Sequence, residues 1–93
     1  KANRFAIEQK IETLARYLNL PDATFDGFVT WVLLMRSVLN IPHCLSEISI
    51  DDSEKALVGE MSVKDPSASG NPIQFNARQY QDIFEKAVKG ILI

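Results

Sequence analysis

The sequence of 93 residues carries ten Lys and Arg against twelve Asp and Glu, and 46% of its residues are hydrophobic. This balance is ordinary for a globular domain and argues against a disordered or fibrous chain, while the scattered basic residues disfavour nucleic-acid binding. A single Cys and a single His exclude an internal disulfide and a four-ligand zinc site. No apolar run is long enough to span a bilayer. We expect a cytoplasmic protein with neither a nucleic-acid nor a membrane partner.

Two helical segments open the chain. Between Asn3 and Asn19 the apolar positions recur at helical spacing, at Ile7, Ile11, Leu14 and Leu18. Pro21 and its neighbours are expected to end that helix. From Thr24 to Asn40 apolar residues are nearly continuous, so a buried strand competes with a helix, and the lack of turn residues after Gly27 favours one long helix. We expect it to be the most buried helix, because it has the least polar surface.

The middle of the chain predicts a turn and two more helical segments. Ile41-Pro42 is expected to turn the chain, and Cys44 to Ile48 to form one turn of helix. Asp51, with Glu54 three residues later, fits a capping box that starts a helix running to about Lys64.

This helix is expected to bury three apolar residues, Leu57, Val58 and Met61. Gly59 has two interpretations, because it either permits a close helix contact or simply weakens the helix.

A final helix is the most clearly marked. Asn76 and Gln79 fit a capping box, and Phe75 is placed to pack on Tyr80. Its apolar face is formed by Tyr80, Ile83, Phe84, Ala87, Val88 and Ile91, and Glu85 and Lys89 fit an ion pair. The predicted fold is all-α, a helical bundle of four main helices plus one short helix.

The loop from Lys64 to Pro72 is the best candidate for a functional site. Ser67, Ser69 and Asn71 offer small polar groups, and Gly70 permits a positive φ. Most loops of this composition only connect two helices, and contact with a ligand is the alternative.

No catalytic constellation is present elsewhere. His43 lacks a spaced second ligand, so it is interpreted as structural. Cys44 is interpreted as a small buried apolar residue, and Asp51 with Asp52 as helix-capping residues rather than paired acids.

Two stretches carry a resemblance to a known family. Residues 39–48 (LNIPHCLSEI) and residues 63–72 (VKDPSASGNP), followed by the final amphipathic helix, resemble the C-terminal end of the iron-dependent (group III) alcohol dehydrogenases. The anchors are Ile41-Pro42 and Asn71-Pro72. Residues 3–39 fit the preceding helices of that family by pattern.

The resemblance implies that residues 1–93 are the closing part of the helical C-terminal domain of a two-domain enzyme. An N-terminal domain, absent here, would bind NAD or NADP, and an Asp and three His upstream would hold a divalent metal, Fe or Zn. Hydride would pass between the nicotinamide and a small alcohol or aldehyde. The chain alone would hold no catalytic residue, metal or cofactor, and would be inactive. Ser67 would lie at the edge of the cleft, where many relatives carry Cys.

The competing hypothesis is a free-standing helical interaction module, in which the helix from Phe25 to Leu39 contacts a partner. A first residue of Lys1 rather than Met suggests a piece of a longer protein, natural or excised, or disordered residues missing ahead of Lys1. The reading frame upstream of Lys1 distinguishes the two hypotheses. The substrate, the choice of NAD or NADP, the metal and the oligomeric state stay open, and oligomers are compatible with the sequence.

Overall fold

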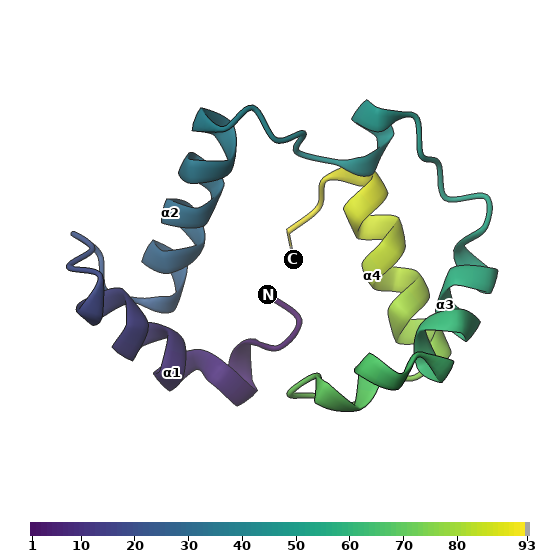
Figure 1. Ribbon diagram of the computed structural model, residues 1–93, viewed down its shortest axis with the longest axis horizontal. Helices are drawn as coiled ribbons and strands as arrows, with labels where there is room; N and C mark the ends of the chain where they lie inside the picture. The colour runs from purple at the N-terminus through teal and green to yellow at the C-terminus, as the bar shows by residue number, and fades with distance from the viewer. Residues whose placement is uncertain (93) are drawn as a thin grey trace. The chain divides into compact units, whose positions relative to one another are not determined.

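A computed structural model describes residues 1–92, and all regular structure in that range is helical. The elements are α1 (Arg4–Tyr17), α2 (Phe25–Val38), η1 (Leu45–Ile48), α3 (Lys55–Lys64), η2 (Pro66–Gly70) and α4 (Ala77–Lys89), where η marks a 3-10 helix (Figure 1). The predicted all-α class is confirmed. Within the described residues, no helix is both long and apolar enough to cross a bilayer.

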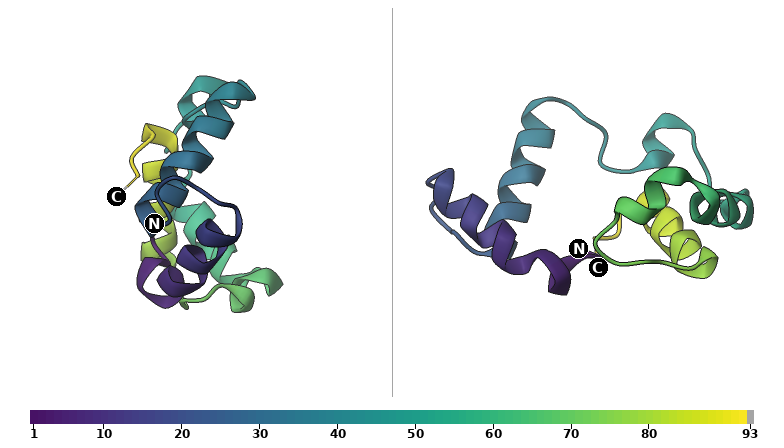
Figure 2. Two further views of the ribbon diagram at one scale, coloured as in Figure 1. Left: turned by 90° about the vertical axis from the view of Figure 1, so that its left-hand side faces the viewer. Right: turned by 60° about the horizontal axis from the view of Figure 1, so that its bottom comes forward.

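The chain divides into two compact units. One unit runs from Asn3 to Pro42 and holds α1 and α2, and the other holds the elements from His43 onward together with the first two residues. The α-helices pack in pairs, α1 against α2 and α3 against α4 (Figure 2). The four predicted main helices are therefore present, and the packing within each pair is what positions their side chains.

The hairpin of α1 and α2 has a small apolar centre. Ala15 and Phe25 are buried in it. The first helix ends at Tyr17, because Asn19 takes a left-handed conformation (φ 54°) and the Leu20 N–H donates to the Ala15 carbonyl at 3.1 Å. Helix α1 thus stops before Pro21, at a turn that Asn19 makes.

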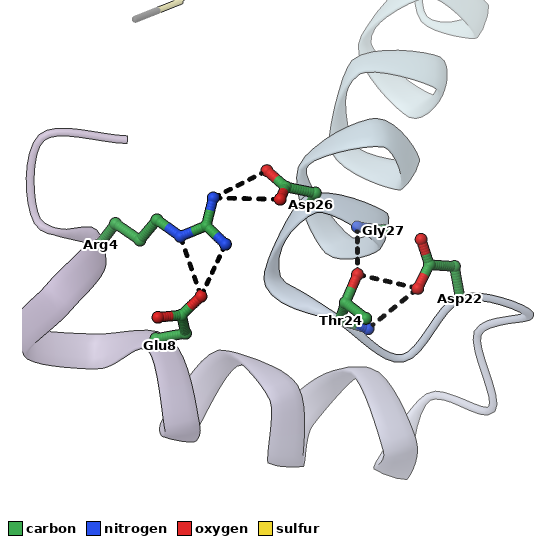
Figure 3. A network of polar contacts seen from close by, with 6 residues as sticks. All are labelled: Arg4, Glu8, Asp22, Thr24, Asp26 and Gly27. Carbon is green, nitrogen blue, oxygen red and sulfur yellow. Dashed lines mark hydrogen bonds and ion pairs between the residues drawn. The ribbon is translucent and has the colours of Figure 1, made fainter.

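The second helix begins at a well-formed cap (Figure 3). The Thr24 side chain accepts a hydrogen bond from the Gly27 N–H at 3.0 Å and donates one to Asp22 at 2.8 Å. A Cβ at Gly27 would lie 2.1 Å from the Asp22 carbonyl oxygen, so the turn closes tightly over the first residues of the helix. Because Thr24 caps the helix, α2 starts at Phe25, one residue after the predicted start at Thr24.

Arg4 joins the starts of the two helices (Figure 3). Its guanidinium donates to Glu8 at 2.7 and 2.9 Å and to both carboxylate oxygens of Asp26 at 3.0 and 3.1 Å. It also lies 4.7 Å from the centre of the Phe25 ring, within the range of a cation–π interaction. The bonds to Glu8 and Asp26 raise the pKa of Arg4, which stays charged at every ordinary pH. Arg4 therefore orients α1 against the first turn of α2.

Helix α2 carries a second apolar face. Leu34 follows Phe25 by nine positions, which at about 3.6 residues per turn places it on the opposite side of the helix. Leu34 is 63% exposed and Val38 is 72% exposed. The helix predicted to be the most buried is thus exposed along the C-terminal half of α2, because α1 covers only one side.

The residues before α3 do not form the predicted capping box. The helix begins at Lys55 after Glu54, which makes no side-chain cap bond. Asp51 instead accepts hydrogen bonds from the Ser53 hydroxyl and from its N–H, the latter at 2.9 Å, and these lower the pKa of the Asp51 carboxyl. The predicted Asp51–Glu54 box is wrong, because Asp51 closes a local turn ahead of the helix. The predicted short helix is confirmed as η1, from Leu45 to Ile48.

Helix α4 begins as predicted. The Asn76 side chain accepts from the Gln79 N–H, and the Gln79 side chain accepts from the Asn76 N–H, each at 2.9 Å. The Phe75 and Tyr80 rings meet edge to face with their centroids 5.6 Å apart. Both backbone donors are thus satisfied and the entering chain is held against the helix, so the capping box and the Phe75–Tyr80 contact are confirmed.

Replacing Asn76 by Ala should lower the free energy of unfolding by about 1 kcal/mol, because one N–H of the first turn loses its acceptor. Urea unfolding followed by helical circular dichroism measures this loss. Asn76→Asp is the matched control, since it keeps an acceptor and places a negative charge at the helix N-terminus. Equal stability of Asn76→Ala and Asn76→Asp would contradict this account of the cap.

Helices α3 and α4 approach closely at Gly59. A Cβ built on Gly59 would lie 2.5 Å from the Ala77 carbonyl oxygen and 2.6 Å from Cγ of Gln81. Gly59 is itself buried. Of its two interpretations, the close helix contact is confirmed.

The face of α3 that carries Leu57 and Met61 is uncovered. Leu57 is 52% exposed and Met61 is 62% exposed, while Val58 is half-buried. The prediction that Leu57 and Met61 are buried is wrong, because α4 covers only the side of α3 that holds Gly59. Helix α3, like α2, is apolar on a face that its partner helix does not reach.

The C-terminal half of α4 is held by polar contacts. Glu85 pairs with Lys89, as predicted, and with Lys55 of α3 at 3.1 Å. The helix ends at Gly90, whose φ of 72° lies in the left-handed region, and the Gly90 carbonyl accepts a hydrogen bond from His43 Nε2 at 2.9 Å. Glu85 and His43 thereby connect α4 to the segments before it.

The Glu85 ion pairs predict a pH dependence of stability. Lys89, and then Lys55, lower the pKa of the Glu85 carboxyl in the folded protein. A carboxyl with a lowered folded pKa stabilises the protein above its ordinary pKa, and this contribution disappears as the pH falls through the lowered value. Glu85→Gln should therefore lose less stability than wild type between neutral and acid pH, measured as the urea midpoint.

Glu60→Gln is the control, because Glu60 is exposed on α3 and has no ion pair within residues 1–92. Its pH profile should run parallel to that of the wild type. A Glu85→Gln profile that also ran parallel would show that the pairs add nothing to stability.

Candidate functional site

The candidate loop between α3 and α4 is more ordered than a simple break. After Lys64 the chain extends at Asp65, and Pro66 starts the short helix η2, which ends at Gly70. Asp65 accepts a hydrogen bond from the Ser67 N–H at 2.7 Å. The proline fixes φ at the first helical position and the aspartate supplies the cap, so sequence alone accounts for this turn.

Side chains of the loop hold its own backbone carbonyls. Ser69 donates to the Pro66 carbonyl at 3.2 Å, and Asn71 donates to the Ile73 carbonyl. Gln74 reaches the carbonyls of Ser69 and Asn71 at 3.3 and 3.2 Å. Two of the three small polar residues proposed for a ligand, Ser69 and Asn71, are thus already engaged within the loop.

Gly70 does not adopt the positive φ that a glycine allows. Among the described glycines, only Gly90 has a positive φ. A Cβ added at Gly70 would meet no atom within 4 Å. The positive φ that Gly70 permits is therefore not adopted, because the chain turns through the 3-10 helix η2 instead.

Ser67 differs from its neighbours. Its backbone N–H is bonded to Asp65, but its hydroxyl makes no hydrogen bond within residues 1–92, and the residue is exposed. The side chain leaves a backbone that is fixed at Asp65 and Pro66. Chemically, it offers one O–H donor and an acceptor oxygen on a rigid turn.

The remaining sequence candidates have structural contacts. His43 donates to the Gly90 carbonyl, and its own N–H is bonded to Glu47 at 2.8 Å. The Cys44 sulfur lies 3.0 Å from the Ser46 hydroxyl oxygen, in a half-buried position. Across residues 1–92, no group of three or more His, Cys, Asp or Glu lies close enough to hold a metal ion. The interpretation of His43 as a structural residue agrees with its contact with Gly90.

A shallow surface hollow lies elsewhere, along α1. It is lined by consecutive residues of one helix, from Phe5 to Glu12 apart from Ile11. Because a single helix cannot enclose a ligand, we assign no site to it. None of its lining residues belongs to the predicted loop.

Comparison with protein-family models, with curated proteins and with solved structures finds no match to this chain.

Proposed function

We propose that this chain is the C-terminal helical part of a metal-dependent alcohol dehydrogenase, which transfers hydride between an alcohol or aldehyde and NAD or NADP. The proposal is supported by the order of short motifs along the sequence. Ile41-Pro42 comes before η1, Asp65-Pro66-Ser67 and Asn71-Pro72 frame the loop around η2, and the capped helix α4 follows.

The uncovered apolar faces support one part of this proposal, that the chain packs against further protein. Leu34 and Val38 of α2, and Leu57 and Met61 of α3, are each more than half exposed on faces that the partner helix does not cover. Large exposed apolar residues, grouped on one face, usually mark a surface that contacts further protein. Such faces fit a segment that packs within a larger enzyme.

The metal and the nucleotide would be bound by residues outside this sequence. The described residues bring together no group that fits a metal. In the proposed enzyme the bound metal, Fe or Zn, would polarise the substrate oxygen. The present chain would contribute the edge of the cleft at Ser67, where the fixed turn holds a hydroxyl that makes no hydrogen bond within residues 1–92.

The test is to extend the natural reading frame upstream of Lys1 and to assay the protein that it encodes. We expect NAD- or NADP-linked oxidation of short primary alcohols, lost after chelation and restored by Fe(II) or Zn(II). A version that stops before Lys1 is the control and should be inactive, because it lacks all of residues 1–93, including the turn that carries Ser67. A stop codon or unrelated sequence just upstream, or no turnover of any alcohol or aldehyde with either metal, would remove the enzyme proposal.

The second candidate is a free-standing helical interaction module, favoured by the same exposed residues Leu34 and Val38. An amphipathic helix of a partner would lie on this face of α2. Leu34→Asp separates the two functions. In a module it abolishes partner binding and leaves helical content and melting temperature intact, whereas in the enzyme it lowers the melting temperature of the intact protein, because a charge enters a packed interface.

A further inference from the structure

We draw no further inference here: the strongest candidate, the apolar surface patch of Leu57 and Met61 on the face of α3 that α4 leaves exposed, carries none, because nothing in the structure shows what covers it.

Discussion

Gly59→Val should lower the free energy of unfolding by about 2 to 3 kcal/mol, near the upper end of what overpacking costs. The added Cβ would meet the Ala77 carbonyl oxygen at 2.5 Å, and backbone cannot move aside as a flexible side chain can. The two Cγ methyl groups of Val need still more space. The helices must therefore separate, and the capped start of α4 must move with Ala77.

The loss is large for a chain of this size. At about 0.05 to 0.15 kcal/mol per residue, a chain of 93 residues has a free energy of unfolding of about 5 to 14 kcal/mol. Urea unfolding gives the change in midpoint, and hydrogen exchange should show faster opening of α3 and α4. Gly59→Ala should cost less than Gly59→Val, because the smaller side chain recovers about 1 kcal/mol of helix propensity.

Gly70→Val is the matched control. A Cβ at Gly70 meets nothing within 4 Å, and its φ is not positive. The same chemical change should therefore alter stability by less than about 1 kcal/mol. If Gly59→Val were as mild as Gly70→Val, the close approach of α3 and α4 would not exist in solution.

Local signals in the sequence predicted the start of α4 correctly. Asn76 and Gln79 lie three residues apart with Phe75 and Tyr80 beside them, and the box forms as predicted. At Asp51 the local signals predicted the wrong interaction. A carboxylate ahead of a helix can cap the helix or close a turn with a nearby hydroxyl, and Ser53 lies close enough to favour the turn.

The positions of apolar residues predicted the helices but not what covers them. Leu57 and Met61 have the spacing of a buried face, yet spacing cannot say whether the covering surface belongs to the same chain. The same holds for Leu34 and Val38 of α2, both of them exposed. The role of Gly59 stayed open in the sequence for a related reason. Only the position of α4 shows whether this glycine makes a close helix contact or simply weakens α3.

At the candidate site, the structure shows the conformation of the loop, whereas the expected role of Ser67 comes from the sequence. The sequence predicted a break in the helix between Pro66 and Pro72, and the structure adds the short helix η2 with the Ser67 N–H bonded to Asp65. The expectation that Ser67 lies beside a cleft comes from the family resemblance. Its test requires the intact protein, because a cleft edge has a function only when the opposite wall is present.

Ser67→Trp in the intact enzyme should lower kcat/KM at least about tenfold, which corresponds to about 1.4 kcal/mol. The turn is fixed at Asp65 and Pro66, so a large side chain at Ser67 cannot easily be redirected by the backbone. If Ser67 borders the cleft, the indole occupies space that the substrate or the nicotinamide needs. If the loop only connects two helices, the indole extends into water and the kinetics stay unchanged.

Ser67→Trp should change the stability of the fold very little. Ser67 is exposed, its hydroxyl makes no hydrogen bond within residues 1–92, and the bond to Asp65 uses the backbone N–H that Trp also has. The melting temperature should therefore change little. Ser67→Cys should retain nearly wild-type kinetics if the proposed function is right, because the proposed family resemblance implies Cys at this position in many relatives.

Ser53→Trp is the control for Ser67→Trp, because each serine lies two residues after an aspartate that accepts its backbone N–H. The Ser53 N–H is bonded to Asp51 at 2.9 Å, as the Ser67 N–H is to Asp65 at 2.7 Å, and both serines are exposed. Ser67 is the second residue of η2, whereas Ser53 lies in the turn before α3. Both variants thus introduce the same bulk two residues after an aspartate that accepts the backbone N–H. A decrease in kcat/KM confined to Ser67→Trp would place Ser67 at the cleft. Equal kinetics in wild type and a correctly folded Ser67→Trp enzyme would remove Ser67 from the site, while an equal decrease in both variants would assign the effect to bulk on any such turn.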